Sequence, residues 1–501
     1  MKGDSTSQEV NPLVNREGCY PLPSGNAWST QQNNATNANY TSYPAGSTNN
    51  NNKNNSYYAV PTSESISILD SILDAEDDCF KNKKSRIDAC KIHYHLSELR
   101  GLIKDLKDGR FVSYKSLCFV LDYPTFREVF AAAYIERIVH HLCAPYIQQV
   151  TEKVHSINGD ISHGNRKGHS ALTAAIQLQE RMKKYPNGIV VGFDIQGCFM
   201  HIVRELAWEV FAHYEYIFTP DGYTKEQREW LMWLIHEMII RNPTENCEKH
   251  SPESAWLNIK PEKSLFNNPF GLPIGNFYAQ LIANLLLALV DEILDMIHFV
   301  DDFGDALPDI ESANRKKKLF NERTSDINLT MHPRKVYIQP VRHGIKICGT
   351  VVFPNRMYIT NRVVHACNNK IDYYLYREEF SFETALKIVC CVNSYTGRMS
   401  KLYAFNIQIK LVNRVLESRY SKYIIARSEY NHLVLNIKPE YSAKFVFNGI
   451  YNKLTKIHKN YVWRSSQSRS GRYIKAGANK RRMGSALSLR TDRNGRNNGL
   501  H

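Results

Sequence analysis

Two adjacent aspartates, Asp301 and Asp302, lie in the run HFVDDF at residues 298–303, and this run restricts the architecture of the chain more than any other. The flanking residues are apolar and favour strands, so the pattern predicts a strand–turn–strand hairpin with both carboxylates at its tip. Each of two crowded carboxylates raises the cost of ionising the other. A divalent cation removes that cost, because hard cations prefer carboxylate oxygens. An Asp-Asp pair alone is also common in a solvated turn, so a metal site needs a third carboxylate.

A third carboxylate, Asp194, follows the run GIVVGF at residues 188–193. This run is short, apolar and rich in β-branched residues, which is typical of a buried strand. A buried strand that ends in an acid, together with an acidic hairpin, predicts a two-metal phosphoryl-transfer site. In such a site two ions ~3.5–4 Å apart bind the attacking and the leaving oxygens. The alternative is that Asp194 caps a following helix, as Asp often does.

A series of motifs also resembles, in chain order, the sequence boxes of reverse transcriptases. HFVDDF contains an aromatic-x-Asp-Asp box, and FDIQGCF at residues 193–199 is similar to the first catalytic box of that family. The boxes cover roughly residues 120–360 and lie at residues 127–141, 164–168, 193–199, 271–280, 299–302, 328–335 and 347–350. The resemblance implies an α+β fold, a right-hand polymerase with fingers, a palm of antiparallel sheet plus helices, and a helical thumb.

The resemblance assigns the catalytic roles to Asp194, Asp301 and Asp302. Asp194 and Asp301 would hold two Mg²⁺ ions, with Mn²⁺ as an alternative, and the backbone carbonyl of Ile195 would be a further ligand. Asp302 would be a weaker ligand or act through a neighbouring group. The implied activity is that of an RNA-directed DNA polymerase, which transfers nucleotides by two-metal phosphoryl transfer.

Other matched positions would bind the incoming dNTP. On a Gly-flanked turn, Arg166 and Lys167 could neutralise its triphosphate, although a solvated basic turn has the same composition. Phe199 matches a ring that excludes the 2′-hydroxyl, and its alternative is an ordinary core residue. Lys335 matches a lysine near the leaving pyrophosphate, or else a surface lysine at a strand end. The expected dNTP-binding set is Arg166, Lys167, Phe199, Ile274, Gln280 and Lys335.

The box GLPIGNFYAQ at residues 271–280 narrows the subfamily. Most reverse transcriptases carry Gln at the position of Ile274. Together with the preceding KSLF at residues 263–266, the box resembles reverse transcriptases of diversity-generating retroelements. These enzymes copy a template repeat into cDNA with errors at template adenines, and the cDNA then replaces a variable repeat in a target gene. Isoleucine lacks the hydrogen bond that glutamine could make near the nascent pair, and each ~1.4 kcal/mol of lost discrimination is tenfold in errors. The alternative is that Ile274 is simply a packing residue.

Two other functions stay open at this point. One is an accurate bacterial reverse transcriptase of a retron, a group II intron or a phage-defence system. The other is a catalytically silent RNA-binding scaffold, which the presence of all three carboxylates disfavours. In the expected subfamily Ser precedes Gln280, whereas this chain has Ala279, so the contribution of that serine is missing.

The start of the chain is rich in asparagine, with ten Asn in residues 33–55. Such a polar tract cannot bury enough apolar surface to fold, so it predicts disorder over residues 1–62. The segment also resembles the end of a retroelement variable protein, and Asn codons are rich in adenine. We therefore hypothesise that residues 1–60 are partly translated template repeat. A near-copy in a neighbouring gene, differing mainly at adenines, is the expected finding in the coding DNA.

The end of the chain is basic. The formal net charge is +15, and residues 453–498 hold thirteen Lys or Arg against a single acid, Asp492. Basic side chains interleaved with aromatic rings suit phosphate neutralisation and base stacking, and such binding weakens with salt. A solvated basic tail is the alternative. The expected nucleic-acid-binding residues are Gly349 in the last box and, in this tail, Lys475, Lys480, Arg481 and Arg482.

Composition and periodicity predict the terminal segments of the chain, and the resemblance implies fingers, a palm and a thumb between them. The six segments are a disordered segment 1–62, a helical extension 63–120, fingers 121–187, a palm 188–360, a helical thumb 361–450 and a basic tail 451–501. Eleven scattered cysteines without a Cys-x-x-Cys pair disfavour structural zinc. The lack of a signal peptide predicts a cytoplasmic protein, bacterial or phage-encoded, and the apolar stretch 281–290 is too short to span a membrane. The resemblance implies template RNA, cDNA, dNTPs and a small basic accessory protein as partners.

Overall fold

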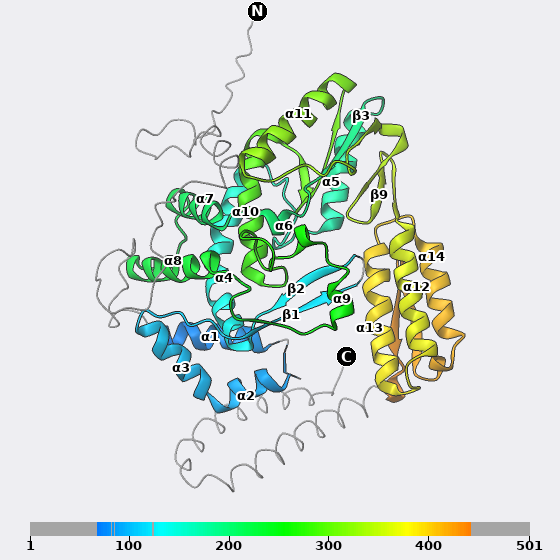
Figure 1. Ribbon diagram of the computed structural model, residues 1–501. Helices are drawn as coiled ribbons and strands as arrows, with labels where there is room; N and C mark the ends of the chain where they lie inside the picture. The colour runs from blue at the N-terminus through cyan, green and yellow to red at the C-terminus, as the bar shows by residue number, and fades with distance from the viewer. Residues whose placement is uncertain (1–67, 82, 85, 123–124, 442–501) are drawn as a thin grey trace, which may run out of the picture. The chain divides into compact units, whose positions relative to one another are not determined.

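The computed structural model describes residues 68–441 apart from 82, 85, 123 and 124, and in these residues helices and strands are mixed (Figure 1). The chain divides into two units, Met1–Thr360 and Asn361–His501. This boundary falls where the sequence predicts the palm to end, although the functional names of the units stay predictions. The Asn-rich segment and the basic tail lie outside the described residues, and so do Lys475, Lys480, Arg481 and Arg482.

The first unit contains most of the elements. Its helices are α1 (Ile68–Phe80), α2 (Ile87–His95), α3 (Ser97–Lys107), α4 (Tyr134–Ile157), α5 (Ala171–Lys184), α6 (Cys198–His201), α7 (Arg204–Ile217), α8 (Lys225–Ile240), α9 (Glu253–Trp256), α10 (Phe277–Leu294) and α11 (Ile310–Asp326). Its strands are β1 (Ser116–Leu121), β2 (Arg127–Ala131), β3 (Ile189–Asp194), β4 (Cys247–Lys249), β5 (Ile297–Phe299), β6 (Asp302–Leu307), β7 (Tyr337–Pro340), β8 (Ile345–Ile347), β9 (Thr350–Phe353) and β10 (Arg356–Ile359). The second unit contains α12 (Asn361–Tyr376), α13 (Phe382–Met399), α14 (Phe405–Leu416), β11 (Ile424–Glu429) and β12 (His432–Ile437).

The helical extension predicted over residues 63–120 is confirmed from Ile68 to Lys107, where α1, α2 and α3 lie. Helix α3 buries Leu99, Leu102 and Leu106 along one face, at the spacing that an amphipathic helix requires. The prediction is wrong at its end. Residues 116–121 form strand β1, because the run SLCFVL is aromatic and β-branched and finds partners in β2 and β4.

A four-stranded antiparallel sheet, in the order β5-β6-β3-β7, forms the centre of the first unit. Alternate residues face opposite sides of it. On one side Phe193 and Phe303 pack against Phe320 of α11. On the other side Gly192 and Gly304 leave no room for a Cβ, because side chains of β8 and α5 approach the backbone there. The sheet is therefore covered on both faces, and only its strand ends are free to present functional groups.

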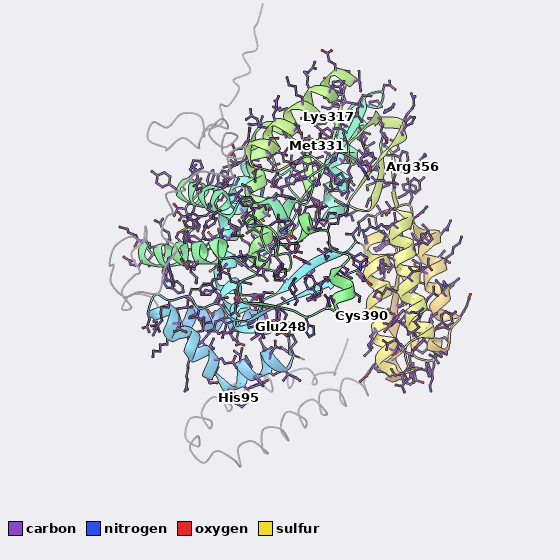
Figure 2. All side chains as sticks on the ribbon, in the orientation of Figure 1. His95, Glu248, Lys317, Met331, Arg356 and Cys390 are labelled. Atoms are coloured by element: carbon purple, nitrogen blue, oxygen red, sulfur yellow. The ribbon has the colours of Figure 1, made fainter. Side chains whose placement is uncertain are left out.

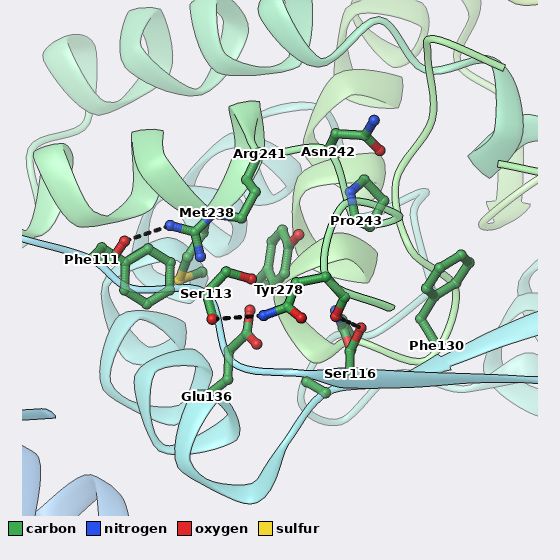
Figure 3. A pocket seen from close by; sticks show the side chains of 13 residues that line it. Phe111, Ser113, Ser116, Phe130, Glu136, Met238, Arg241, Asn242, Pro243 and Tyr278 are labelled. Atoms are coloured by element: carbon green, nitrogen blue, oxygen red, sulfur yellow. Dashed lines mark hydrogen bonds between the residues drawn. The ribbon is translucent and has the colours of Figure 1, made fainter. Parts of the chain in front are cut away.

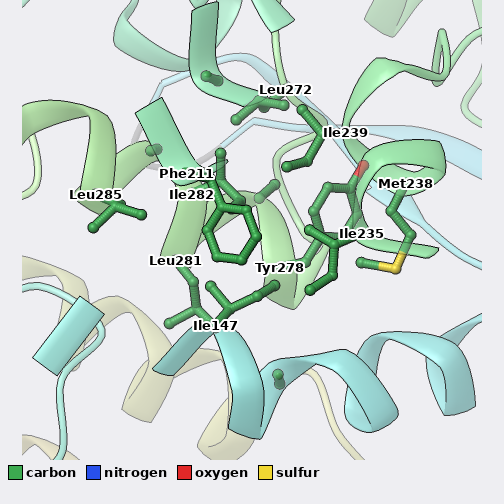
Figure 4. Packing of buried hydrophobic residues seen from close by; sticks show 14 of the residues in the cluster. Ile147, Phe211, Ile235, Met238, Ile239, Leu272, Tyr278, Leu281, Ile282 and Leu285 are labelled. Carbon is green, nitrogen blue, oxygen red and sulfur yellow. The ribbon is translucent and has the colours of Figure 1, made fainter. Parts of the chain in front are cut away.

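Helix α10 runs through the core and leads into the hairpin. It contains the apolar stretch 281–290, and by length and composition alone the whole helix would also suit a membrane span. Of the segment Phe277–Leu294, 72% is buried inside the structure, and α10 packs against α4, α7 and α11. Figure 4 shows Leu281 and Ile282 of α10 beside Phe211 of α7 and Ile235 of α8. The helix thus acts as the central support of the strands that follow it.

A second sheet, in the order β2-β1-β4, combines strand β1 from the end of the predicted helical extension, β2 from the predicted fingers and β4, which follows α8. Strands β1 and β2 are antiparallel, whereas β1 and β4 are parallel. The main chain of residues 274–275 lies against β2, where the N–H of Phe130 donates to the carbonyl of Ile274 at 2.7 Å. Gly275 has φ +110°, and a Cβ there would collide with the backbone of Phe130. Glycine is therefore required for this close approach.

The second unit has helices where the sequence predicts them, at α12, α13 and α14. The region also contains a feature that the sequence analysis did not predict, because β11 and β12 form an antiparallel hairpin that packs on α13. Polar side chains fix this hairpin. Asn393 of α13 donates to the carbonyl of Leu435 and accepts from its N–H, both at 2.8 Å. Such side-chain pairing with a strand has no periodic signal in the sequence.

Candidate active site

Three carboxylates meet at one end of the central sheet. Asp194 ends β3, Asp302 begins β6, and the two residues are direct partners in the antiparallel register. Asp301 lies in the turn between β5 and β6, and its carbonyl accepts from the N–H of Ile195 at 3.1 Å. The predicted hairpin and the predicted buried strand are both confirmed, and the pairing between them brings Asp194 and Asp302, 108 positions apart in the sequence, together.

The turn that carries Asp301 is strained. Val300 has φ +58°, which is rare for a β-branched residue. Gly164 lies against it, and a Cβ at that glycine would come within 2.7 Å of the Val300 Cγ2 atom. The tight packing on this side and the hydrogen bond to β3 on the other fix the direction in which Asp301 leaves the turn.

Asp194 is held by two partners from the box at residues 328–335. Its carbonyl accepts from the N–H of His332 at 2.7 Å, and its carboxylate accepts from the ammonium of Lys335 at 2.8 and 2.9 Å. Met331, labelled in Figure 2, pairs with Ile195 by an isolated bridge. Lys335, expected near the pyrophosphate, therefore lies at the metal-ligand position and is half exposed, with 51% of its side chain accessible. A cation in this place can release Asp194 as another cation binds.

Asp302 is bound by the turn between β8 and β9. The N–H of Cys348 donates to its Oδ2 atom at 2.7 Å. Cys348 and Gly349 have φ +47° and +76°, so the turn points its N–H inward. The last box, which includes Gly349, is thereby placed next to Asp302, while contact of Gly349 with nucleic acid stays a prediction.

The electrostatics of the three carboxylates suit a cation. Burial, followed by the charge of Asp194, raises the pKa of Asp301 to about 6. Burial also raises the pKa of Asp302, and the N–H of Cys348 works against that rise. Carboxylates that resist ionisation beside one another are the donor set that a divalent cation stabilises. Asp194, Asp301 and the carbonyl of Ile195 are the residues that would hold it.

The three aspartates are spread rather than gathered around one point. Among the described residues, Glu76, Asp77 and His93 are the group whose ligand atoms all lie within 4.8 Å of one another. In that group Glu76 already bonds His93 at 2.9 Å and Tyr134 at 3.1 Å. The group at Glu76 is thus occupied by its own hydrogen bonds, and metal binding by Asp194, Asp301 and Asp302 stays a prediction.

The residues expected to bind dNTP differ in how free they are. Lys167 is exposed, whereas Arg166 is buried, and its guanidinium donates to Glu152 at 2.9 and 3.0 Å, to Asp160 at 2.7 Å and to the carbonyl of Ser162 at 2.8 Å. These bonds favour a structural role for Arg166. Neither Glu152 nor Asp160 was predicted as a partner, because a single ion pair leaves no periodic pattern in the sequence.

The remaining three dNTP candidates are partly buried. Ile274 packs against a small cluster that includes Phe130 and Leu265. The carbonyl of Phe199 accepts from the N–H of Leu272 at 2.8 Å, which ties the first catalytic box to the box at residues 271–280. Gln280 lies in the first turn of α10. The structure thus joins these boxes through the backbone, and their contact with a nucleotide stays a prediction.

A separate pocket lies where α4, α8, β1 and β2 meet (Figure 3). Arg241 donates to the carbonyl of Phe111 at 2.7 Å, and Asn246 donates to that of Ser113 at 2.9 Å. Burial raises the pKa of Glu136 to about 7, and Arg241 opposes the rise. None of the expected dNTP-binding residues lines this pocket, so it belongs to the joint between the second sheet and the helices.

Sequence reasoning missed a set of buried polar residues beneath the hairpin, namely His155, Asp291 and His298. His298 belongs to the run that predicted the hairpin, and a buried histidine directly before an aromatic-x-Asp-Asp box was a signal that could have been read. Asp291 of α10 and His155 of α4 belong to no sequence motif, and only the fold brings them close to His298.

No protein-family model and no curated protein matches the sequence. Solved structures of telomerase are similar to it. Apo telomerase from Candida tropicalis has a TM-score of 0.38 and 10% identity over 65% of this chain and 61% of that chain. Its form truncated from the C-terminal domain gives 0.37 and 11%, over 55% and 62%. Telomerase from Candida albicans in complex with a TWJ fragment of telomeric RNA gives 0.36 and 9%, over 64% and 60%. The chain spans about 60% of the length of these telomerase chains, and the likeness is too distant to assign an activity.

Proposed function

We propose that this chain is an RNA-directed DNA polymerase that uses Asp194, Asp301 and Asp302 for two-metal phosphoryl transfer. The observation that carries the proposal is the pairing of β3 with β6, which sets Asp194 opposite Asp302 and ties Ile195 to Asp301. The raised pKa of Asp301 supports it, since the site is unfavourable without a cation. All three carboxylates being present and convergent disfavours the silent RNA-binding scaffold.

The proposed layout is that of a right hand. The second sheet and its flanks serve as fingers, the central sheet as palm, and the unit from Asn361 as thumb. Bound Mg²⁺ or Mn²⁺ would supply charge neutralisation for the primer hydroxyl and the leaving pyrophosphate. Asp194 and Asp301 would hold these ions, and the N–H of Cys348 fixes the carboxylate of Asp302. Lys335, which can leave Asp194, is free to follow the negative charge that develops on the triphosphate.

Primer extension on an RNA template tests the activity. We expect the full-length protein to extend a DNA primer with Mg²⁺ and dNTPs. Replacing Asp301 and Asp302 together by Asn should lower the rate by about 10³-fold or more, because charge stabilisation of the transition state is lost. The matched control is Asp221→Asn, an exposed carboxylate paired with Lys153. Extension that survives the double substitution would show that the metal assignment is wrong.

We further propose that the polymerase is the mutagenic enzyme of a diversity-generating retroelement, which copies a template repeat with errors at adenines for retrohoming into a variable gene. The supporting observation is Ile274, which packs among apolar residues and offers no hydrogen bond to a nascent pair. A small basic accessory protein and a cytoplasmic setting in a bacterial or phage-carrying cell belong to the same proposal. The alternative is an accurate reverse transcriptase of a retron, a group II intron or a defence system.

The error spectrum separates these two enzymes. Sequencing the cDNA made on the cognate RNA, with the accessory protein supplied, should show errors concentrated opposite adenine. Ile274→Gln should reduce that error frequency, by roughly tenfold for each 1.4 kcal/mol of discrimination regained. Ile274→Val is the matched control, because it keeps an apolar side chain and should leave the spectrum unchanged. Accurate copying by the unmodified protein would move the assignment to the alternative.

A further inference from the structure

A buried carboxylate lies between two imidazoles beneath the catalytic turn. Asp291 of α10, 4% exposed, faces His298 of β5 and His155 of α4, both wholly buried. Its Oδ2 atom is 3.0 Å from Nε2 of His298 and 3.6 Å from Nδ1 of His155. A buried charge is costly unless it is paired and hydrogen-bonded. The three residues come from separate elements, so the cluster is formed only by the fold.

The hydrogen-bond partners define where the protons lie. Nδ1 of His298 faces the carbonyl of Val300 at 2.9 Å, and its Nε2 faces Asp291, so both ring nitrogens meet acceptors and both carry protons. Burial opposes a charged ring, but the Asp291 carboxylate raises the pKa of His298 above its usual range. The two contacts of His298 thus favour the charged ring, paired with the Asp291 carboxylate.

His155 approaches Asp291 from the other side. Asn284 accepts from Ser162 at 2.9 Å and donates to the carbonyl of Gly164 at 3.0 Å, which fixes the orientation of its amide. The same amide donates to Nε2 of His155 at 3.0 Å, so the proton of His155 lies on Nδ1, on the side of Asp291. The Nδ1 atom makes no hydrogen bond at its distance of 3.6 Å, so the hydrogen-bonded chain runs from Asp291 through His298 to the carbonyl of Val300.

That carbonyl belongs to the strained residue next to Asp301. Val300 adopts φ +58°, and strain of this kind persists only where the surroundings over-determine it. Three constraints act on the turn: the packing of Gly164, the bond from Ile195 to Asp301, and the bond from His298 to Val300. Only the third comes from a side chain, and Asp291 aims that side chain.

We infer that His298, aimed by Asp291, is a positioning residue that holds the Val300–Asp301 turn so that Asp301 can bind the catalytic metal. The inference rests on the proposed polymerase function and deepens it. Misplacing a catalytic group by about 1 Å can cost 10²-fold in rate, so the bond to Val300 should matter more for activity than for stability.

Two substitutions separate the two bonds of His298. The amide nitrogen of Asn stands as many bonds from Cα as Nδ1 of His, and that of Gln as many as Nε2. His298→Asn therefore keeps the donor to Val300 and leaves Asp291 without its closest partner. His298→Gln keeps the bond to Asp291 and removes the donor to Val300. His213→Gln, on α7 and without a part in this network, is the matched control.

The two variants should then rank in opposite order for activity and for stability. His298→Gln should lower kcat for primer extension by about tenfold or more and raise the Mg²⁺ concentration for half-maximal rate, with KM for dNTP unchanged. His298→Asn should melt at a lower temperature than His298→Gln, because it strands a buried carboxylate, yet extend faster. Activity that follows melting temperature across the variants would overturn the inference.

A second readout does not depend on polymerase activity. Mn²⁺ binding, measured by electron paramagnetic resonance on the same full-length variants, should weaken at least several-fold in His298→Gln relative to His298→Asn. If the unmodified protein binds Mn²⁺ with this pattern but extends no primer, the proposed function fails and the positioning role stands. Equal binding in both variants, or no binding in the unmodified protein, would overturn the positioning role.

Discussion

The hairpin turn at residues 298–303 and the turn at residues 164–168 are both short, charged and matched to functional boxes, yet they differ in how their charges are met. Asp301 has a raised pKa and no cationic partner within its own turn. Arg166 has four hydrogen bonds to Glu152, Asp160 and Ser162. The two turns also touch, since Gly164 packs on Val300. One turn is therefore held ready for a ligand, and the other is complete within the protein and supports it.

The largest effect on stability is expected at Arg166. Replacing it by Ala should lower the free energy of unfolding by about 3 kcal/mol, the lower end for a broken buried ion pair, because Glu152 and Asp160 are partly exposed and can rehydrate. Lys167→Ala, the exposed neighbour, should change it by less than about 0.5 kcal/mol. Chemical denaturation of both variants measures the difference. Equal, small losses would mean that Arg166 is free for substrate.

At Asp301, in contrast, a substitution is expected to increase the free energy of unfolding. Its pKa is raised from 3.8 to about 6 by burial and by Asp194, so ionising it destabilises the folded state. The penalty is absent below about pH 4, grows between about pH 4 and 6, and is complete above that. Without metal, Asp301→Asn should therefore be more stable than the unmodified protein at pH 8, by about 2 kcal/mol. The full shift corresponds to roughly 3 kcal/mol, and partial exposure reduces it.

Thermal melting across this pH range, without metal and then with Mg²⁺, checks the prediction. The stability difference between Asp301→Asn and the unmodified protein should vanish near pH 4. Added Mg²⁺ should reverse it at pH 8, because only the unmodified site gains a ligand for the cation. A difference that does not depend on pH would mean that the carboxylates do not repel one another in solution.

Some features of the two turns could be predicted from the sequence, and others depend on contacts that only the folded structure shows. The hairpin, the strand before Asp194 and the helices α12 to α14 follow from local patterns of apolar and β-branched residues. The partners of Arg166 lie only 4 to 14 residues away, but a single ion pair leaves no periodic pattern in the sequence. The contact of Asp291 with His155 depends on the fold. The hairpin of β11 and β12 was not predicted, although its strands IIARSE and HLVLNI carry β-branched residues that favour strands. Charged motifs such as those at Asp301 and Arg166 can be found in the sequence, but only the folded structure shows which of these charges already has a partner within the protein.

A smaller effect is expected where the two turns meet. Gly164→Ala places a Cβ against Val300, 2.7 Å from its Cγ2 and 3.0 Å from its nitrogen. The overpacking should cost about 1–2 kcal/mol of stability, and the displaced turn should lower the extension rate by more than that loss explains. Gly101→Ala is the control, because nothing lies within 4 Å of a Cβ there. Unchanged activity in Gly164→Ala would show that the turns are independent.

The smallest effect on stability is expected at Lys335. Its ammonium is half exposed, so removing the pair with Asp194 by Lys335→Ala should cost no more than about 1 kcal/mol. Without this competing cation, Asp194 should bind Mg²⁺ at lower concentration, whereas the maximal extension rate should fall, because a cation near the developing charge is lost. Titration of extension rate against Mg²⁺ separates the two effects. Weaker Mg²⁺ binding in the variant would show that Lys335 orients Asp194 for the metal instead of competing with it. The charge of Asp194 would then be matched by a side chain of the protein, as the charge of Arg166 is.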